Sequence, residues 1–385
     1  MLLTGSTTDL KRHNRDAVLR LIRQRGAASR TEIADGIGLT NAAVSRITRE
    51  LIDIGLIEEG ERIALQGQAG RRQVTLRIKR DGAYVIGIAV TLNAREIVIA
   101  DARGEITDRE DCSDISLDQA SSALEEFAVR AKALIAKMGP SKRRLIGGAA
   151  SVAGRVSPED GSIMGADPLD WDGLRVAASF ADALGLPFVS EGRAAALLRA
   201  ERDLGPAMGF EDVLLVNVGL KLGAAFMLDG MLLRGARNEA FMLSRYADAR
   251  GRLLDDTASG FAILSQLDEA GHQKSEGIDH GSYLRQLVDD PERLDTVGRS
   301  VFRKSGCKLG EAIAQLAPVL SPQLVILAGI VTRQRDYIAG VEKGLGQSSL
   351  TISQSRFTTA QSAIHLALEH HLFAQASSAD GQAAA

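Results

Sequence analysis

Two short helical patterns separated by a single glycine lie near the N-terminal end of the chain. Ser29 and Glu32 have the spacing of a capping box, in which each side chain satisfies the backbone N–H of the other residue. Gly38 allows a tight turn, and a second helix is predicted from about Asn41 to Ile54 with Thr40 as its cap. Small and apolar residues at the expected crossing favour a helix-turn-helix. They are Ile33, Ala34, Ile37, Leu39, Val44, Ile47 and Leu51.

The flanking segments extend this unit. A helix is predicted from Asn14 to Arg25. After the second helix, LIEEGERIAL and QVTLRIK alternate as strands and predict a hairpin, whose tip is the glycine-containing segment 66–72. A tip that ends in Arg71 and Arg72 suits a wing that contacts phosphates or a narrow minor groove, or else a solvated loop. Residues 1–80 are therefore interpreted as a winged helix-turn-helix domain.

Charge supports a polyanionic partner for this domain. Residues 1–80 hold 15 Lys and Arg against 9 Asp and Glu, a net charge of +6, whereas the remainder carries −9. We therefore predict binding to an operator in double-stranded DNA, with Arg46 reading guanine and Asn41 reading adenine. The alternative is a three-helix surface that docks a protein. The predicted DNA-binding residues are Thr40, Asn41, Ala42, Ser45, Arg46, Arg49, Gly70, Arg71 and Arg72.

From residue 81 onward, strands alternate with helices, which predicts an α/β body. Trp171 is expected in its core, with the floor of a cleft as the alternative, and His370 and His371 are expected at the surface. The last residues, 376–385, are expected to be a disordered tail. Cys112 and Cys307 are the only cysteines, which excludes a disulfide framework. No apolar run reaches the ~18 residues of a membrane span and no secretory signal is evident, so we expect a cytoplasmic protein without a membrane partner.

Three stretches of the body resemble the ROK family of repressors, open reading frames and sugar kinases. They are LDWDGLRVAASFADALGLPFVSEGRAAALLRAE, LLVNVGLKLGAAFMLDGMLLRGA and LGEAIAQLAPVLSPQLVILAGIV. The resemblance extends from about Asn14 to His371. It implies a two-lobed, actin-like and hexokinase-like domain over residues 81–375, with a sugar cleft between the lobes. Family members with a winged helix are transcriptional regulators, and members without one are mostly sugar kinases.

The positions that would hold a nucleotide depart from the kinase pattern of this family. Ala89 stands at the position of the aspartate in the first phosphate loop, and the glycines of that loop are missing. In the second loop, Leu220 and Leu222 are expected to hinder close backbone approach to a phosphate. Glu191 stands in the motif of the catalytic base, where Arg193 is expected to pair with it and lower its basicity. The sequence therefore predicts no enzyme activity and no cofactor. The alternative is an ATP-dependent sugar kinase with an accessory DNA-binding head.

The sugar clamp is altered as well. Met242 and Arg245 stand where family members have Glu and His, and the cysteines of the family's zinc cluster are missing, so no metal is expected. Arginines in the cleft favour an anionic effector, a sugar acid or sugar phosphate, although internal salt bridges in a degenerate cleft remain the alternative. The predicted ligand-binding residues are Glu191, Arg193, Arg245 and Asp255.

These observations predict a carbohydrate-linked transcriptional regulator, most simply a repressor. We expect a homodimer or a dimer of dimers, because a near-palindromic operator mirrors a two-fold protein. A sugar or sugar-derived effector between the lobes would change their closure and thereby the affinity for DNA.

Overall fold

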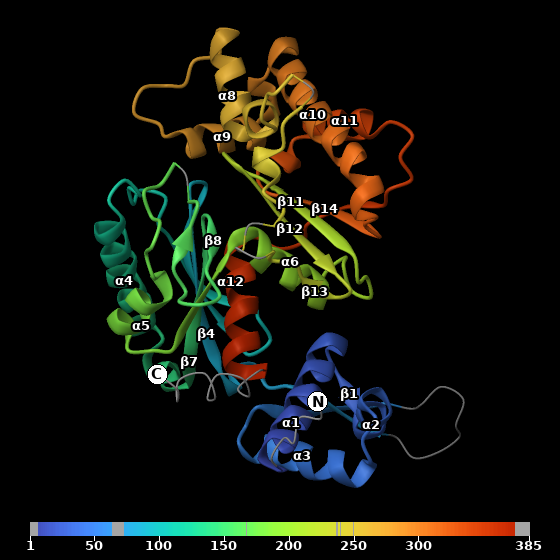
Figure 1. Cartoon of the computed structure of the whole chain (residues 1–385). Helices are drawn as coiled ribbons and strands as arrows, with labels where there is room; N and C mark the ends of the chain where they lie inside the picture. The colour runs from blue at the N-terminus through green and yellow to red at the C-terminus, as the bar shows by residue number, and fades with distance from the viewer. Residues whose placement is uncertain are drawn as a thin grey trace.

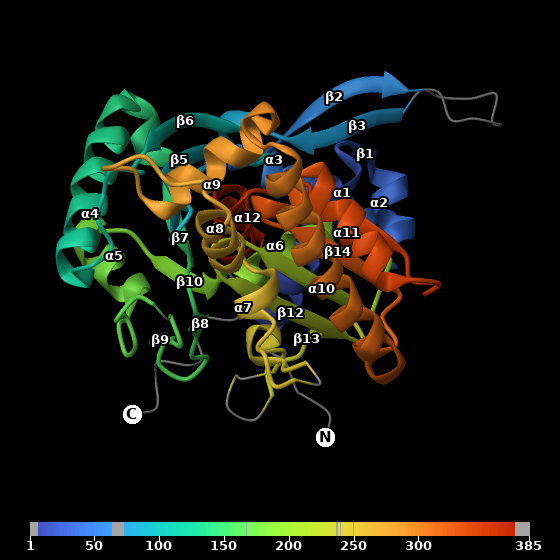
Figure 2. The same cartoon turned by 90° about the horizontal axis from the view of Figure 1, so that it is seen from above.

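The computed structural model describes residues 7–63, 73–166, 168–235, 238, 240–248 and 250–373. A small N-terminal head (residues 7–78) lies beside a body made of two α/β lobes (Figures 1 and 2). None of the described helices combines the length and apolar character that crossing a membrane requires.

The head has the helices and the hairpin that the sequence predicts, although α1 begins at Thr7, seven residues before the predicted start at Asn14. Ser29 Oγ accepts a hydrogen bond from the Glu32 backbone N–H at 3.3 Å, and Glu32 Oε2 accepts one from that of Ser29 at 2.7 Å, which completes the capping box. Gly38 ends the first helix of the motif in the left-handed region, with φ of 70°. The strand order is β1-β3-β2. The elements of the head are α1 (Thr7–Arg25), β1 (Ala28–Ser29), α2 (Arg30–Ile37), α3 (Asn41–Asp53), β2 (Ile57–Ile63) and β3 (Gln73–Ile78).

The first lobe is built on a five-stranded sheet with the order β10-β7-β4-β5-β6. β4 pairs in parallel with β7 and antiparallel with β5, and its apolar residues are buried on both faces. Helices α4 and α5 cover one face, and α12 covers the other. Its elements are β4 (Tyr84–Thr91), β5 (Ala94–Asp101), β6 (Ile106–Asp111), α4 (Ala120–Lys137), β7 (Leu145–Val152), β8 (Arg155–Val156), β9 (Ile163–Met164), α5 (Val176–Leu184), β10 (Phe188–Gly192) and α12 (Thr359–Leu368).

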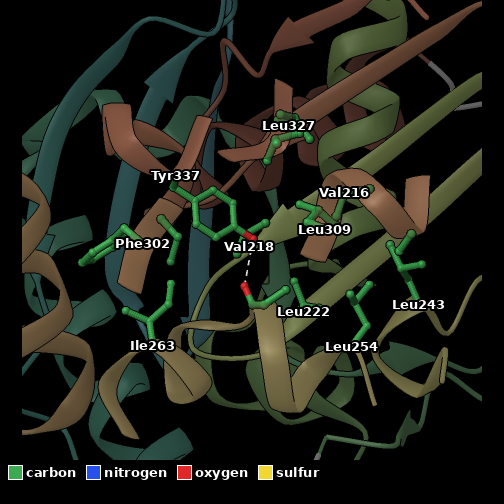
Figure 3. Close-up of a cluster of buried hydrophobic side chains, with 14 of the residues drawn as sticks. Val216, Val218, Leu222, Leu243, Leu254, Ile263, Phe302, Leu309, Leu327 and Tyr337 are labelled. Carbon is green, nitrogen blue, oxygen red and sulfur yellow. Dashed lines mark hydrogen bonds between the residues drawn. The ribbon is translucent and has the colours of Figure 1, made fainter. Parts of the chain in front are cut away.

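The second lobe has a five-stranded sheet with the order β13-β12-β11-β14-β15. Its main core lies beneath helices α7, α8 and α10, and the Tyr337 hydroxyl donates a hydrogen bond to the carbonyl of Ala258 at 2.8 Å inside it (Figure 3). Its elements are β11 (Val213–Val218), β12 (Leu222–Leu228), β13 (Met231–Leu232), α7 (Asp255–Ala258), α8 (Gly260–Glu269), α9 (His280–Asp289), α10 (Thr296–Leu320), β14 (Leu324–Ala328), α11 (Arg335–Leu345) and β15 (Ile352–Gln354).

One helix connects the lobes at the centre of the molecule. Helix α6 (Arg193–Leu204) starts directly after β10 of the first lobe, packs on β11 and β12 of the second, and lies against α12. In Figure 1 the lower end of α12 faces the head. Apolar residues of α1 and α12 belong to one continuous buried cluster, which includes Leu19, Ile22, Ile364 and Leu368. The head is therefore packed against the body instead of being joined to it only by a linker.

Two expectations about interior side chains have different outcomes. Trp171 is buried in the first lobe, and its Nε1–H donates to the carbonyl of Leu117 at 3.0 Å, so it belongs to the core. The surface position expected for His371 is wrong, because the five-residue π-helical turn Glu369–Phe373 directs it inward. There its Nε2–H donates to the carbonyl of Gly148 at 3.0 Å.

Candidate functional site

Helix α3 of the head presents one polar face to solvent. Its apolar residues are buried against α1 and α2, so positions one turn apart on the opposite side are accessible. The Thr40 hydroxyl accepts a hydrogen bond from the backbone N–H of Ala43 at 3.2 Å and so caps the helix at the end that would enter a groove. Thr40, Asn41, Ala42, Arg46 and Arg49 are exposed, and Ser45 is half-buried. The predicted base-reading residues thus share one accessible face, and their contact with DNA stays a prediction.

Arg30 of α2 holds helix α3 against strand β2. Its Nε donates to the Thr48 hydroxyl and its Nη2 to Glu59 of β2, both at 3.2 Å. β2 and β3 pair antiparallel as far as Ile63 and Gln73, so the predicted hairpin is present. The residues predicted for the wing tip, Gly70, Arg71 and Arg72, lie outside the described residues.

A cleft of about 320 Å³ lies where the two lobes meet. The first lobe lines it from the ends of β4, β7 and β10, and the second lobe from β12 and the segment after β13. All four predicted ligand-binding residues, Glu191, Arg193, Arg245 and Asp255, line it. The structure therefore brings together residues that are up to 64 positions apart in the sequence.

The pairing expected between Glu191 and Arg193 is wrong. Glu191 is the last residue but one of β10, and it is buried with its carboxylate toward the second lobe. It accepts hydrogen bonds from Arg234, and Arg199 of α6 lies 3.8 Å away from its Oε2. Arg193, one residue beyond Gly192, starts the helix and points elsewhere, because a strand-to-helix turn separates the two side chains.

Arg193 extends toward the turn between β4 and β5. Its Nη1 donates to Asn93 Oδ1 at 3.3 Å. With the amide oxygen of Asn217 turned toward the guanidinium, that oxygen accepts from Nε at 3.1 Å and also from Nη2. Burial lowers the pKa of Arg193 to about 10, so the group stays charged at neutral pH. Amide oxygens, which carry no formal charge, are thus the hydrogen-bond acceptors that the described residues offer this cation.

Asp255 organises the second loop of the cleft. Its Oδ1 accepts from the backbone N–H of Leu222 at 2.8 Å, and its Oδ2 lies 2.9 Å from Nζ of Lys221. The expectation that Leu220 and Leu222 would crowd this loop needs correction, since both side chains are buried in the core of the second lobe. The loop amide of Leu222 is instead engaged by a carboxylate of the protein itself.

Three cleft residues were not predicted from the sequence. Arg234 pairs with Glu191, Asn238 donates its amide to the carbonyl of Val156 at 2.7 Å, and Arg155 donates to the carbonyl of Asn238 at 2.6 Å. Each contact joins the first lobe to the segment after β13. Asn238 has a positive φ of 51°, a conformation that asparagine adopts more readily than most residues. Their meeting depends on the closure of two lobes, which no local pattern reports.

The described lining of the cleft carries an excess of positive charge. Five basic side chains face three acidic ones, so two positive charges are in excess. Arg245 is exposed on the rim, at the end of the 3₁₀ turn Leu243–Arg245, and Met242 lines the same wall. The basic residues are Arg155, Arg193, Lys221, Arg234 and Arg245, and the acidic ones are Glu191, Asp255 and Asp256.

Models of known protein families match both the body and the head of the chain. The model of the ROK family matches residues 85–366, and that of the MarR family matches residues 14–59. The xylose repressor of Caldicellulosiruptor bescii is 25% identical over 342 residues, which cover 84% of each chain. The DNA-binding transcriptional dual regulator NagC of Escherichia coli is 24% identical over 341 residues, 85% of this chain and 83% of NagC.

Solved structures show the same fold. A ROK family transcriptional regulator described as a homologue of the E. coli MLC protein superposes with a TM-score of 0.72 at 22% identity, over 96% of this chain and 99% of that one. A ROK family glucokinase from Streptomyces griseus, solved with glucose and AMPPNP, has a TM-score of 0.61 at 18% identity and covers 74% of this chain and 98% of its own. Since the family match spans most of the described body and the fold agrees, the chain belongs to the ROK family.

Proposed function

We propose that this chain is a sugar-responsive transcriptional repressor, which binds operator DNA through α3 and a small sugar-derived effector through the cleft between its lobes. The observation that carries the proposal is the accessible N-terminal face of α3, on a head joined to a body of the ROK family. The xylose repressor and NagC align with this chain over more than four fifths of their length.

We further propose that two copies bind one near-palindromic operator. A single α3 reads only a few base pairs, and repressors of this kind gain affinity by placing two recognition helices in successive major grooves. The dimer would form through the body, and its wings, with Gly70, Arg71 and Arg72, would add phosphate or minor-groove contacts.

The chemistry of the cleft favours an anionic effector, a sugar acid or sugar phosphate. Arg193 is held by amide oxygens, so its charge is not neutralised by a carboxylate in contact. A bidentate carboxylate or phosphate would neutralise the charge of such a guanidinium. The competing view, in which the arginines serve only internal salt bridges, fits Arg234 but not Arg193.

The same residues argue against phosphoryl transfer. Family kinases would place nucleotide phosphates between the turn at residues 91–93 and the loop at residues 219–223. Here the side chains of Arg193 and Asn93 lie against Gly219, and the Asp255 carboxylate accepts the hydrogen bond of the Leu222 backbone N–H. The amide of Leu222 is therefore not free to donate to a nucleotide phosphate. We therefore propose that the body is not catalytic and uses no cofactor.

DNA binding is tested by selecting bound duplexes from a random library and measuring their dissociation constants by fluorescence anisotropy. Arg46→Ala should cost ~1–3 kcal/mol on the selected operator and should relax specificity at one base position. Arg109→Ala is the matched control, because Arg109 is exposed on β6 of the body. Equal losses for Arg46→Ala on selected and random DNA would contradict the reading role of α3.

The effector is tested by calorimetry with neutral sugars, sugar acids and sugar phosphates. We expect heat from an acidic sugar, and Arg193→Met should weaken that binding at least tenfold, whereas Arg109→Met should not change it. A panel without heat from any acidic sugar would refute the anionic effector. ADP release from ATP with hexoses, measured in a coupled assay, would refute the non-catalytic assignment if turnover appeared.

A further inference from the structure

A second cavity, separate from the cleft, lies at the junction of the head and the body. Its volume is about 400 Å³, and α1 of the head, α6 and α12 line it together with the turn after α12. In Figure 1, α12 and α1 approach each other on this side of the molecule. Its described lining consists of Arg20, Arg23, Gln24, Arg199, Arg202, Asp203, Leu204, His365, Leu366, Glu369 and His370.

The two carboxylates of this cavity are already paired. Glu369 forms ion pairs with Arg23, whose Nη1 lies 2.9 Å from the carboxylate, and with Arg20, whose Nε lies 3.2 Å from it. Asp203 accepts two hydrogen bonds from Arg202 in a bidentate geometry, at 2.6 and 3.0 Å. It accepts a third from the Nε2–H of His365 at 2.9 Å. Burial opposes ionisation of Asp203, but the hydrogen bonds from His365 and Arg202 outweigh it and lower its pKa. Both carboxylates are therefore engaged by cations of the protein.

Four arginines face these two acidic groups, so the lining holds two positive charges in excess. The Nε atom of Arg23 is buried without a hydrogen-bond partner among the described residues, and the buried Nε atom of Arg199 makes no hydrogen bond but lies 3.8 Å from Oε2 of Glu191. The Arg23 side chain is only 7% exposed, and its guanidinium stacks over the Phe373 ring at 4.8 Å from the centroid. An unsatisfied guanidinium N–H at a buried position is unfavourable unless a ligand accepts it.

A cation would not fit this charge pattern. Asp203, His365 and Glu369 bring potential metal-ligand atoms within 4.8 Å of one another. A divalent ion among them would compete with three arginines for the same oxygens and would stand beside four guanidinium groups. The electrostatic field of the cavity instead favours an anion with several acceptor oxygens.

We propose that this junction cavity binds a phosphate group, either as inorganic phosphate or as the monoester of a small metabolite. Phosphate supplies acceptors for several guanidinium N–H groups at once, which matches the four arginines that line this cavity. Because Arg23 belongs to the head and Arg199 to the body, the bound anion connects α1 to α6. It thereby fixes the orientation of the head on the body and links DNA binding to a second, phosphate-bearing signal. This last consequence rests on the proposed function, whereas the binding site itself does not.

The experiment is a calorimetric titration of the full chain with inorganic phosphate, with glycerol 3-phosphate and with glycerol, at constant ionic strength in chloride. We expect saturable binding of inorganic phosphate, of glycerol 3-phosphate or of both, and no binding of glycerol. The compound that binds with the lower dissociation constant identifies the ligand as free phosphate or as a monoester. Absence of saturable binding of either phosphate up to millimolar concentration in the wild-type chain would overturn the proposal.

Substitutions of single arginines locate the bound anion. Arg23→Gln and Arg199→Gln should each weaken phosphate binding at least tenfold, and a measurement on either variant is sufficient if the other does not fold. Arg25→Gln, on the same helix but outside the lining, is the matched control and should change the dissociation constant less than twofold. Binding that survives Arg23→Gln and Arg199→Gln but is lost in Arg193→Gln would assign the anion to the cleft and overturn the junction site. Failure of DNA binding with phosphate binding intact would refute the proposed function and leave the junction site standing.

Discussion

At the scale of single residues, burial decides what the histidines near the end of the chain do. His365 and His371 are buried and His370 is half-buried, and desolvation lowers the pKa of all three imidazoles. They are therefore neutral in the folded protein at neutral pH. The unfolded chain takes up protons as the pH falls through about 6.5, the ordinary pKa of histidine.

This difference predicts a loss of stability in mild acid. The folded state binds fewer protons than the unfolded state below about pH 6.5, so the free energy of unfolding falls there by up to ~1.4 kcal/mol per pH unit for each histidine. Urea denaturation at pH 7.5, 6.5 and 5.5 measures the slope. His371→Gln should reduce it, because the glutamine amide keeps a donor for the carbonyl of Gly148 and does not titrate.

Comparing His371→Gln with the wild type separates the contribution of His371 to the pH dependence of stability from that of two buried acids, which act in the opposite direction. Burial raises the pKa values of Asp16 and Glu201, so these groups favour the folded state at low pH and lose that contribution as the pH rises. His13→Gln is the control, since His13 is exposed on α1. Equal slopes in wild type and His371→Gln would show that His371 is not buried in its neutral form.

At the scale of elements, the contact between α10 and α11 depends on glycines on both helices. A Cβ built at Gly306 would overlap the carbonyl oxygen of Tyr337, and one at Gly310 would overlap that of Val341. Gly340 and Gly344 of α11 face backbone atoms of α10 in the same way. The helices therefore touch backbone to backbone, and no side chain at these positions can rotate away from the clash.

Alanine at Gly310 should consequently destabilise the second lobe, although alanine is the better helix former. The helix propensity gains up to about 1 kcal/mol, whereas overpacking typically costs ~1–3 kcal/mol and more when the obstacle is backbone. We expect a lower urea midpoint, measured by circular dichroism. Gly281→Ala is unsuitable as a control because Gly281 also faces backbone, so Ser348→Ala, exposed beyond α11, serves instead. A midpoint that rises in Gly310→Ala would contradict the close contact.

The elements themselves were largely predictable, and the site only in part. α2 and α3 follow from local signals, namely the Ser29–Glu32 box, the Gly38 turn and the Thr40 cap. The strands follow from apolar runs such as the one in β4. The partner of Glu191 could not be predicted, because Arg234 lies 43 positions away and reaches it only after the lobes close. The junction cavity escaped prediction for the same reason, since it joins residues of α1, α6 and α12.

At the scale of the whole molecule, helix α6 connects the cleft between the lobes with the junction of the head and the body. It begins at Arg193 in the cleft, contacts Glu191 through Arg199 six residues later, and carries Asp203 in its last turn at the junction with the head. Its 12 residues span about 18 Å at 1.5 Å per residue. A rigid element that contacts both sites offers one physical route for coupling between the proposed effector and DNA.

Coupling between the effector and the operator predicts that each ligand changes the affinity for the other by the same factor. If the effector lowers the affinity for the operator by some factor, the operator must lower the affinity for the effector by the same factor, typically about 5- to 150-fold. Calorimetry of the effector with and without operator, and anisotropy of the operator with and without effector, measure the two factors independently. Asp203→Asn removes the charge that His365 and Arg202 share at the end of α6, so this variant should bring both factors closer to one. Arg109→Ala, far from α6, should leave them unchanged. A coupling that persists undiminished in Asp203→Asn would mean that the signal reaches the head by another path, because the junction end of α6 would then be dispensable.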